Sequence, residues 1–238
     1  MDSLETLRSW VASAERMVFF GGAGVSTESG LPDFRSVDGL YSQKFDVPPE
    51  VMLSHDYFLE KPEAFYRFYR EKMLCLDAQP NDAHRTLARW EREGKLLAVV
   101  TQNIDGLHQK AGSRRVYELH GSVYRNHCTR CGKFFGPEYV RDHSPVPYCD
   151  ACGGLVKPDV VLYGESLDGD CLRGAAEAIA QADVLLVGGT SLTVYPAAGL
   201  LGYYRGSRLA LLNRDATPRD GDADLILRAP IAQVLGQL

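Results

Sequence analysis

Three short, continuous apolar runs constrain the fold of this chain most strongly. They occupy residues 97–100, 184–187 and 209–212, and helical patterns such as 171–182 and 196–204 separate them. Strands that are buried on both faces have this composition, because neither side of the strand meets water. Alternation of such strands with helices predicts an α/β fold in which a mostly parallel sheet carries helices on both faces.

A glycine-rich turn follows a fourth apolar run near the N-terminus. Residues 17–20 lead directly into a turn that contains Gly22 and Gly24. A strand, a glycine turn and a helix begin many nucleotide-binding domains, because the turn lets backbone N–H groups approach a pyrophosphate. Thr27 stands where the dehydrogenase fingerprint has a third glycine, and no strand ending in an acidic residue is evident near position 45. The pattern therefore favours nucleotide binding and argues against a hydride-transferring Rossmann enzyme.

Four of the six cysteines form two C-x-x-C pairs, which is a metal-ligand pattern. Cys128 and Cys131 are followed, after 17 residues, by Cys149 and Cys152. This spacing is typical of a four-cysteine zinc site, in which two tight loops each supply two thiolates. Four thiolates leave no open coordination position, so we expect a structural and not a catalytic Zn²⁺. The surrounding stretch, 126–154, interrupts the alternation of strands and helices and is predicted to be an inserted module.

Polar side chains follow the apolar run at 97–100. Gln102, Asn103 and Asp105 lie there, at the carboxyl end of a predicted buried strand, where open α/β sheets bind ligands. A turn without any function has a similar Asn, Asp and Gly composition. The glycine turn after another strand favours the functional interpretation.

His120 is the candidate general base. It follows a predicted strand at 116–119 and precedes Gly121. An imidazole has an unperturbed pKa of about 6.5 and therefore accepts protons at neutral pH. A hydrogen-bonded histidine without a catalytic role is the alternative. Thr190 and Asn213 follow two further strands, so several strand ends bring small polar or ionisable groups to one edge of the sheet.

Composition and charge narrow the remaining classes of function. The chain has 238 residues, enough for one large domain with a smaller insert, and its formal net charge of −5 argues against a general nucleic-acid binder. The N-terminus lacks a basic segment before an apolar run, and no apolar run approaches the roughly 18 residues of a membrane span. We expect a cytoplasmic protein with no direct nucleic-acid partner and no membrane partner.

Taken as a set, the motifs of this chain resemble those of the sirtuin family. They occur in the family's order and cover the chain from about residue 15 to the C-terminus. Besides the two C-x-x-C pairs and Asn213, the matching segments are GAGVSTESGLPDFR at 22–35, TQNIDGLH at 101–108, ELHGS at 118–122, KPDVVLYGE at 157–165 and GGTSLTVYP at 188–196.

The resemblance implies two domains with a cleft between them. Residues 1–40, 76–124 and 155–238 would form a Rossmann-like NAD-binding domain. A helical insert at 41–75 and a zinc-ribbon module at 125–154 would form the small domain. NAD would lie between the two domains, and an acyl-lysine would enter from the other side of the cleft.

The resemblance also implies which residues bind NAD. They would come from the glycine turn and its continuation, the polar loop, His120, two later strand ends and a late segment near the adenine: Gly22, Ala23, Gly24, Thr27, Phe34, Arg35, Gln102, Asn103, Ile104, Asp105, His120, Gly189, Thr190, Ser191, Asn213 and Ile231.

The implied reaction is NAD-dependent deacylation of protein lysine, in which NAD is consumed and not reduced. The acyl oxygen attacks the nicotinamide ribose and expels nicotinamide. His120 deprotonates a ribose hydroxyl, which leads to O-acetyl-ADP-ribose and free lysine; Asn103 and Asp105 are the other implied catalytic residues. The segment that pairs with the acetyl-lysine substrate contains Val160, Val161, Tyr163, Gly164 and Glu165.

One position departs from the acidic-acyl members of the family. Sirtuins that prefer succinyl or malonyl groups carry a Tyr and, three residues later, an Arg that holds the distal carboxylate. Here Tyr66 is followed at that position by Tyr69, although Arg67 and Arg70 stand nearby. We expect the unspecialised, acetyl-preferring bacterial type. The alternatives are a desuccinylase or longer-chain deacylase, a mono-ADP-ribosyltransferase, and a zinc-ribbon interaction protein that binds nucleotide without turnover.

Overall fold

A parallel sheet of six strands forms the larger part of this computed structural model, which describes residues 2–34, 39–42 and 45–238. Every pairing within the sheet is parallel. The prediction of a Rossmann-like parallel sheet is therefore confirmed. The strand order is β3 (Val116–Glu118), β2 (Leu96–Thr101), β1 (Met17–Gly21), β7 (Val184–Gly188), β8 (Leu209–Leu212) and β9 (Leu225–Leu227).

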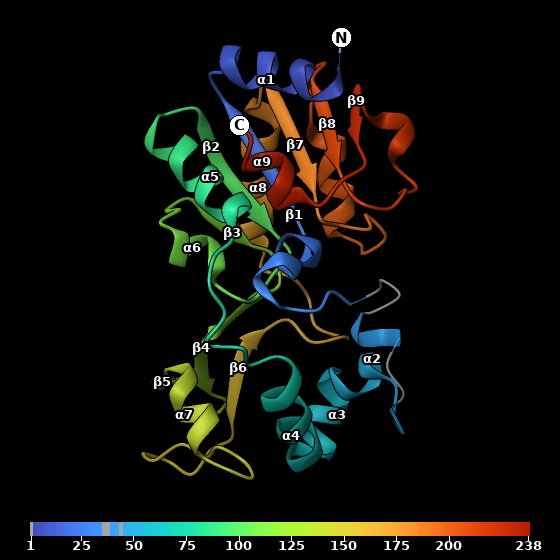
Figure 1. Cartoon of the computed structure of the whole chain (residues 1–238). Coiled ribbons are helices and arrows are strands. Elements are labelled where there is room, and N and C mark those ends of the chain that lie inside the picture. Colours follow the sequence, from blue (N-terminus) through green and yellow to red (C-terminus); the bar gives the residue numbers. More distant parts are fainter. Residues whose placement is uncertain (1, 35–38, 43–44) are drawn as a thin grey trace.

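Helices cover both faces of this sheet. Successive residues of a strand point to opposite faces, so apolar side chains on both faces need cover from water. Phe19 belongs to the core on one face and Phe20 to the core on the other. Figure 1 shows the carboxyl ends of β1, β2 and β7 pointing toward the smaller part of the molecule. The first face carries α1 (Ser3–Ser13), α5 (Asp82–Arg92) and α9 (Ile231–Leu235), and the second carries α8 (Gly169–Gln181) and the 3-10 helix η4 (Ala197–Tyr203).

Two predicted helices are shorter, tighter 3-10 structures. The glycine turn leads not into an α-helix but into η1 (Ala23–Val25) and η2 (Thr27–Ser29). The Gly24 N–H donates to Gly189 O, in the loop that follows the strand at 184–188, and not within a helix. Gly30 then ends η2 with a φ of +84°. The pattern at 196–204 forms η4, where two glycines weaken an α-helix. The longest described helix, α8, has 13 residues, and none of the described helices is long and apolar enough to cross a membrane.

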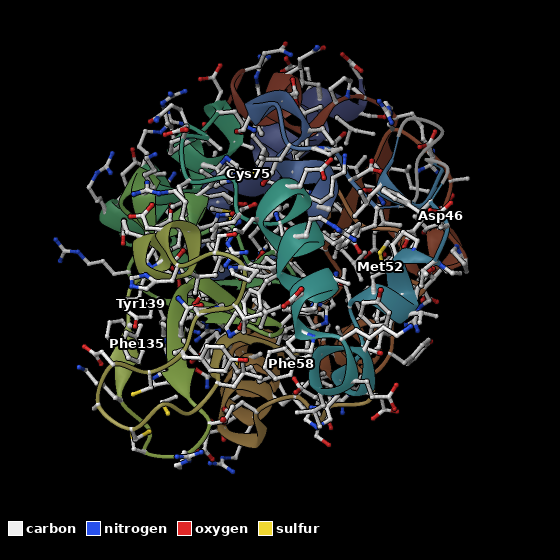
Figure 2. The ribbon with its side chains drawn as sticks, turned by 90° about the horizontal axis from the view of Figure 1, so that it is seen from below. Asp46, Met52, Phe58, Cys75, Phe135 and Tyr139 are labelled. Atoms are coloured by element: carbon white, nitrogen blue, oxygen red, sulfur yellow. The ribbon has the colours of Figure 1, made fainter. Side chains whose placement is uncertain are left out.

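The smaller part of the molecule is built on an antiparallel sheet with the order β5-β4-β6. A third hydrophobic core lies between this sheet and the helices. Figure 2 shows Phe135 and Tyr139 side by side there, and their ring centroids are 4.2 Å apart. The elements are η3 (Leu40–Ser42), α2 (Pro49–Met52), α3 (His55–Glu60), α4 (Pro62–Lys72), β4 (Gly121–Cys128), β5 (Phe134–Phe135), α7 (Pro137–Asp142) and β6 (Val156–Val160).

Helix α4 is joined to the cysteine-rich module by polar contacts. The Tyr66 hydroxyl donates a hydrogen bond to the main-chain carbonyl of Val156. The Arg70 guanidinium donates to the carbonyls of Val140, His143 and Pro145 at 2.7, 2.7 and 2.9 Å. These contacts support grouping the helical insert with the cysteine-rich module, and the domain boundaries themselves stay a prediction.

Candidate active site and metal centre

The candidate nucleotide site lies where the strand order of the large sheet changes direction. The chain moves from β1 outward to β2 and β3 on one side, and it returns to β7, β8 and β9 on the other. Ligands of open α/β sheets bind at such a switch point, beyond the carboxyl ends of the strands. Gly22 follows β1 and Gly189 follows β7, so the glycine turn lies at this point.

The glycines allow two backbones to touch. The Gly24 N–H donates to Gly189 O at 2.8 Å, and the Gly22 N–H donates to Gly188 O at 3.3 Å. A Cβ at Gly189 would lie 2.4 Å from Val25 N, and its φ of +60° disfavours any other residue. A Cβ at Gly24 would lie 2.8 Å from Gly189 Cα. Larger residues at these positions would push the two loops apart and deform the turn.

Three polar side chains from the first two strand ends form one hydrogen-bonded cluster. Ser26 Oγ donates to Asp105 Oδ2 at 2.6 Å, and Asn103 Nδ2 donates to Ser26 Oγ at 3.1 Å. Burial raises the pKa of Asp105, against hydrogen bonds from Ser26, the Leu107 amide and Asn103, which lower it. The predicted Asn103 and Asp105 thus lie together. Ser26 was missed by sequence reasoning, because nothing local marks a serine as the link between two loops.

A second cluster joins the polar loop after β2 to the ends of β7 and β8. Gln102 Nε2 donates to Thr190 Oγ1 at 2.9 Å. The Asn213 side chain accepts from Thr190 N at 3.1 Å and donates to Thr190 O at 2.9 Å. Ile231 lies close behind, because a Cβ at Gly188 would come within 2.2 Å of Ile231 Cδ1. Residues predicted from separate strand ends therefore meet at one edge of the sheet.

His120 is held in one orientation beside these clusters. Its Nδ1 lies 2.9 Å from the Gln102 carbonyl oxygen. A carbonyl only accepts, so Nδ1 carries the proton and Nε2 keeps its lone pair. Burial lowers the pKa of His120, although the hydrogen bond to Gln102 raises it. The imidazole is therefore neutral at pH 7 and able to act as a base.

His108, the other candidate base in the sequence, lies in the core. Its side chain is 1% exposed, and neither ring nitrogen has a hydrogen-bond partner among the described residues. Its ring packs 4.7 Å from the ring of His84, centroid to centroid. Burial, and then the neighbouring His84, lower the pKa of His108 well below its usual value. Of the two histidines, His120 therefore stays the candidate base.

The predicted substrate segment pairs with the strand that begins after His120. Gly121 is opposite Val160 in the β4–β6 ladder, and Val161 N donates to the His120 carbonyl at 3.0 Å. Gly121 has a φ of +75°, and a Cβ there would lie 1.7 Å from the Asp159 carbonyl oxygen. Only glycine fits at position 121, and this lets the predicted substrate segment pair directly beside His120.

After β6, further contacts hold the predicted substrate segment in place. Tyr163 pairs with the chain before α3 as an isolated parallel bridge, and its hydroxyl lies 2.6 Å from that of Tyr41. Glu165 accepts from Leu162 N at 2.8 Å, its Oε1 lies 2.8 Å from His55 Nδ1, and it forms an ion pair with Lys157 at 3.0 Å. The Glu165 carboxylate therefore braces the segment.

The remaining predicted NAD contacts surround the same region. Thr27 Oγ1 donates to the Gly24 carbonyl at 3.1 Å, and Ser191 Oγ lies 2.8 Å from a neighbouring threonine hydroxyl. Phe34 and Ile104 both pack against the core of the smaller part. Ala23 is half-buried in η1. Arg35, predicted to bind the cofactor, lies outside the described residues.

The four predicted cysteines converge as a metal site requires. Their Sγ atoms all lie within 4.8 Å of one another, with Cys128 and Cys152 3.4 Å apart and Cys131 and Cys149 3.7 Å apart. The N–H groups of Arg130 and Cys131 point at Cys128 Sγ at 3.4 and 3.5 Å, which suits a thiolate ligand. Two C-x-x-C loops of thiolates fit Zn²⁺ with a closed, tetrahedral shell.

Fold and site together define a dinucleotide-binding α/β protein that carries a four-cysteine zinc module. The Sir2 family model matches residues 22–196. An NAD-dependent protein deacetylase of Clostridium acetobutylicum is 57% identical over 238 residues, which cover 99% of this chain and 97% of that protein. The chain belongs to the Sir2, or sirtuin, family, as its motifs indicated.

Solved structures agree with this assignment. A Sir2 structure with a p53 peptide and NAD⁺ has a TM-score of 0.87 and 40% identity, covering 100% of this chain and 97% of the other. A Sir2 structure bound to acetylated peptide has a TM-score of 0.87 and 38% identity, covering 100% and 97%. These similarities extend over the whole chain and therefore include both sheets.

Proposed function

We propose that this chain is an NAD-dependent protein lysine deacetylase that converts NAD, acetyl-lysine and water into nicotinamide, O-acetyl-ADP-ribose and free lysine. One observation carries the proposal: a neutral imidazole, His120, is hydrogen-bonded through its own backbone to the segment that would bind the acetylated peptide. The relatives named NAD-dependent protein deacetylase support it. So do the Sir2 structures with NAD⁺ and with acetylated peptide.

His120 is assigned the role of general base. The acetyl oxygen would attack the nicotinamide ribose, so no protein nucleophile is needed for the first step. Nε2 of His120, unprotonated because Nδ1 donates to Gln102, would then take the proton of a ribose hydroxyl. The hydroxyl oxygen closes on the carbon of the former acetyl group. A water molecule then adds to the same carbon and its C–N bond breaks, so that lysine leaves as the free amine and the acetyl group stays on ADP-ribose.

The cluster of Ser26, Asn103 and Asp105 is assigned to the nicotinamide end of the cleft. Its hydrogen bonds connect the loops after β1 and β2, so both loops keep one arrangement when NAD binds. The Gln102, Thr190 and Asn213 contacts would fix the adenosine end in the same way. The four cysteines would bind one Zn²⁺, which would stabilise the small part of the molecule and take no part in the reaction.

The contacts of α4 support acetyl as the preferred acyl group. Arg70 uses its guanidinium on three carbonyls of the cysteine-rich module, and Arg67 is exposed. Tyr69, which takes the place of the arginine of acidic-acyl sirtuins, is fully buried. In the described part of α4, no arginine is left to hold a distal carboxylate inside the core.

The natural partners proposed are acetylated proteins and not nucleic acids. A net charge of −5 supports this choice, because nucleic-acid binders present basic surfaces. Four cysteines kept as metal-binding thiolates fit a reducing compartment, and this supports a cytoplasmic location.

Mono-ADP-ribosyl transfer is the competing activity, because both reactions begin by expelling nicotinamide. Incubation with NAD and either an acetylated or an unmodified peptide separates them by mass spectrometry of the peptide. The proposed function predicts that only the acetylated peptide changes, that it loses its acetyl group, and that no peptide carries ADP-ribose. ADP-ribose on the unmodified peptide would favour the competing activity.

A further inference from the structure

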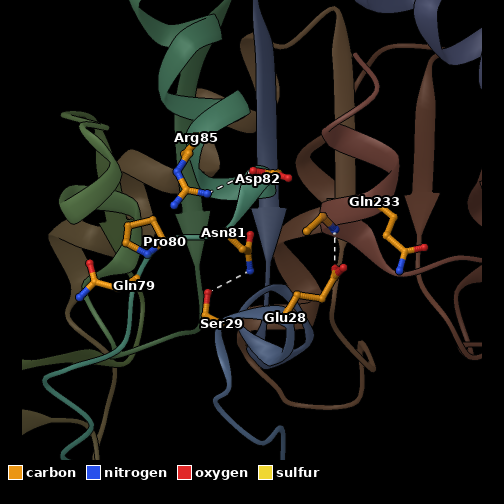
Figure 3. A pocket seen from close by; sticks show the side chains of 9 residues that line it. Glu28, Ser29, Gln79, Pro80, Asn81, Asp82, Arg85 and Gln233 are labelled. Carbon is orange, nitrogen blue, oxygen red and sulfur yellow. Dashed lines mark hydrogen bonds and ion pairs between the residues drawn. The ribbon is translucent and has the colours of Figure 1, made fainter.

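The turn that carries the predicted NAD contacts is anchored from behind by polar contacts outside the catalytic clusters. We call residues 22–30 the cofactor loop. Figure 3 shows a pocket behind it, in which dashed lines join Asn81 to Ser29 and Glu28 to the backbone of α9. Asn81 Nδ2 donates to Val25 O at 2.7 Å and to Ser29 Oγ at 3.1 Å. Glu28 Oε2 accepts from Ala232 N at 2.7 Å.

Asn81 uses both halves of its amide. Its Oδ1 accepts from Ala83 N at 3.0 Å and so caps the N-terminus of α5, while its Nδ2 makes the two bonds to the cofactor loop. Serine and aspartate cap helices about as well as asparagine does. A carboxylate, however, has no N–H to donate. Capping of α5 alone therefore does not explain why this residue is an asparagine. It is also buried, with only 8% of its surface exposed.

The atoms that Asn81 holds are one residue away from the nicotinamide-end cluster. Val25, whose carbonyl accepts from Asn81, directly precedes Ser26, which donates to Asp105. On the other side of the same turn, Gly24 N donates to Gly189 O. A shift of the Val25 carbonyl would therefore move the Ser26 hydroxyl relative to Asp105.

We propose that Asn81 is a positioning residue for NAD binding, which fixes the cofactor loop through the Val25 carbonyl and the Ser29 hydroxyl. The inference rests on the proposed function, since it assigns the loop to NAD. Asn81 contributes to affinity by holding the loop in its binding arrangement before NAD arrives, so that binding does not have to order it.

The test separates the two halves of the Asn81 amide. Asn81→Asp keeps the acceptor that caps α5 but loses both bonds to the loop, and it places a carboxylate oxygen against the Val25 carbonyl. Two lost hydrogen bonds should weaken NAD binding about tenfold. Calorimetry of NAD with the full chain measures this directly. The KM for NAD should rise in parallel, while the KM for an acetylated peptide changes less than twofold.

Asp168→Ala is the matched control. Asp168 caps α8 by accepting from Cys171 N at 2.7 Å, and no described contact joins it to the cofactor loop. Its loss should lower stability without changing NAD affinity. Asn81→Ser, which keeps a capping hydroxyl on a shorter side chain, should weaken NAD binding as Asn81→Asp does. If either Asn81 variant binds NAD as the unmodified chain does, the positioning role is wrong. If the unmodified chain does not bind NAD, the proposed function fails instead.

Discussion

The backbone carbonyl of His120 accepts a hydrogen bond of 3.0 Å from the amide of Val161. The catalytic candidate and the proposed substrate segment are thus parts of one ladder, β4 with β6, in which Gly121 is opposite Val160. At the other end of the same ladder Cys128 is opposite Val156. The strand that begins beside His120 ends at a cysteine of the candidate zinc site, so a bound metal would support the position of both strands.

Loss of a zinc ligand should therefore unfold the small part of the molecule. Cys149→Ala removes one of four thiolates, and because metal binding is coupled to folding it should lower the free energy of unfolding by several kcal/mol. Chemical denaturation and metal analysis of the purified variant measure this. Cys171→Ala, outside the cluster, is the control and should keep one zinc. A Cys149→Ala variant that stays fully folded without metal, and loses only catalysis, would contradict the structural role.

His120→Ala should abolish most turnover while the fold and NAD binding persist. General-base removal typically lowers rates about 100- to 10,000-fold. Steady-state deacetylation and NAD calorimetry on the same variant separate the two effects. His108→Ala serves as the comparison, and it should act through stability because it leaves a cavity in the core. Near-normal deacetylation by His120→Ala, with His108→Ala folded but inactive, would overturn the assignment.

The buried pair of His84 and His108 should make the fold sensitive to acid. Burial, and then the nearby Arg85, lower the pKa of His84 to about 4. The unfolded chain binds protons at this ring below about pH 6.5, whereas the folded protein does not, so protons favour unfolding. From His84 alone, the free energy of unfolding should fall by about 2 kcal/mol between about pH 7 and pH 5.

Denaturation of the His84→Gln variant over this range measures the effect. Glutamine does not titrate, so the variant should show a shallower loss of stability with falling pH. An equal slope in His84→Gln and in the unmodified chain would exclude the explanation.

Acetyl peptides should be better substrates than succinyl peptides. In α4, Arg70 donates to three main-chain carbonyls and Arg67 is exposed, so neither meets a carboxylate in the core. An unpaired buried charge is costly. The ratio of kcat/KM should be at least about tenfold in favour of acetyl. A butyryl peptide is the control, because it is long but uncharged. Equal rates for succinyl and acetyl peptides would contradict the prediction.

The four central strands of the large sheet, β2, β1, β7 and β8, were predictable from sequence because burial on both faces leaves a continuous apolar run. The edge strand β9 was not predicted, because it is short and only half-buried. The zinc cluster was predictable because its ligand spacing is local. Other features depend on contacts that the chain order does not reveal. Ser26 and Asp105 are 79 positions apart, and Asn81 and Val25 are 56 apart. The core location of His108 likewise follows from packing against His84 of another helix.

The central claim is that the acetyl group leaves lysine for ADP-ribose in a reaction that consumes NAD. A peptide with an isotopically labelled acetyl group, incubated with the enzyme and NAD, tests this most directly by mass spectrometry of all products. We predict that the label appears on ADP-ribose, with one nicotinamide released for each acetyl group removed. Label recovered as free acetate from the start of the reaction, without release of nicotinamide, would contradict the account.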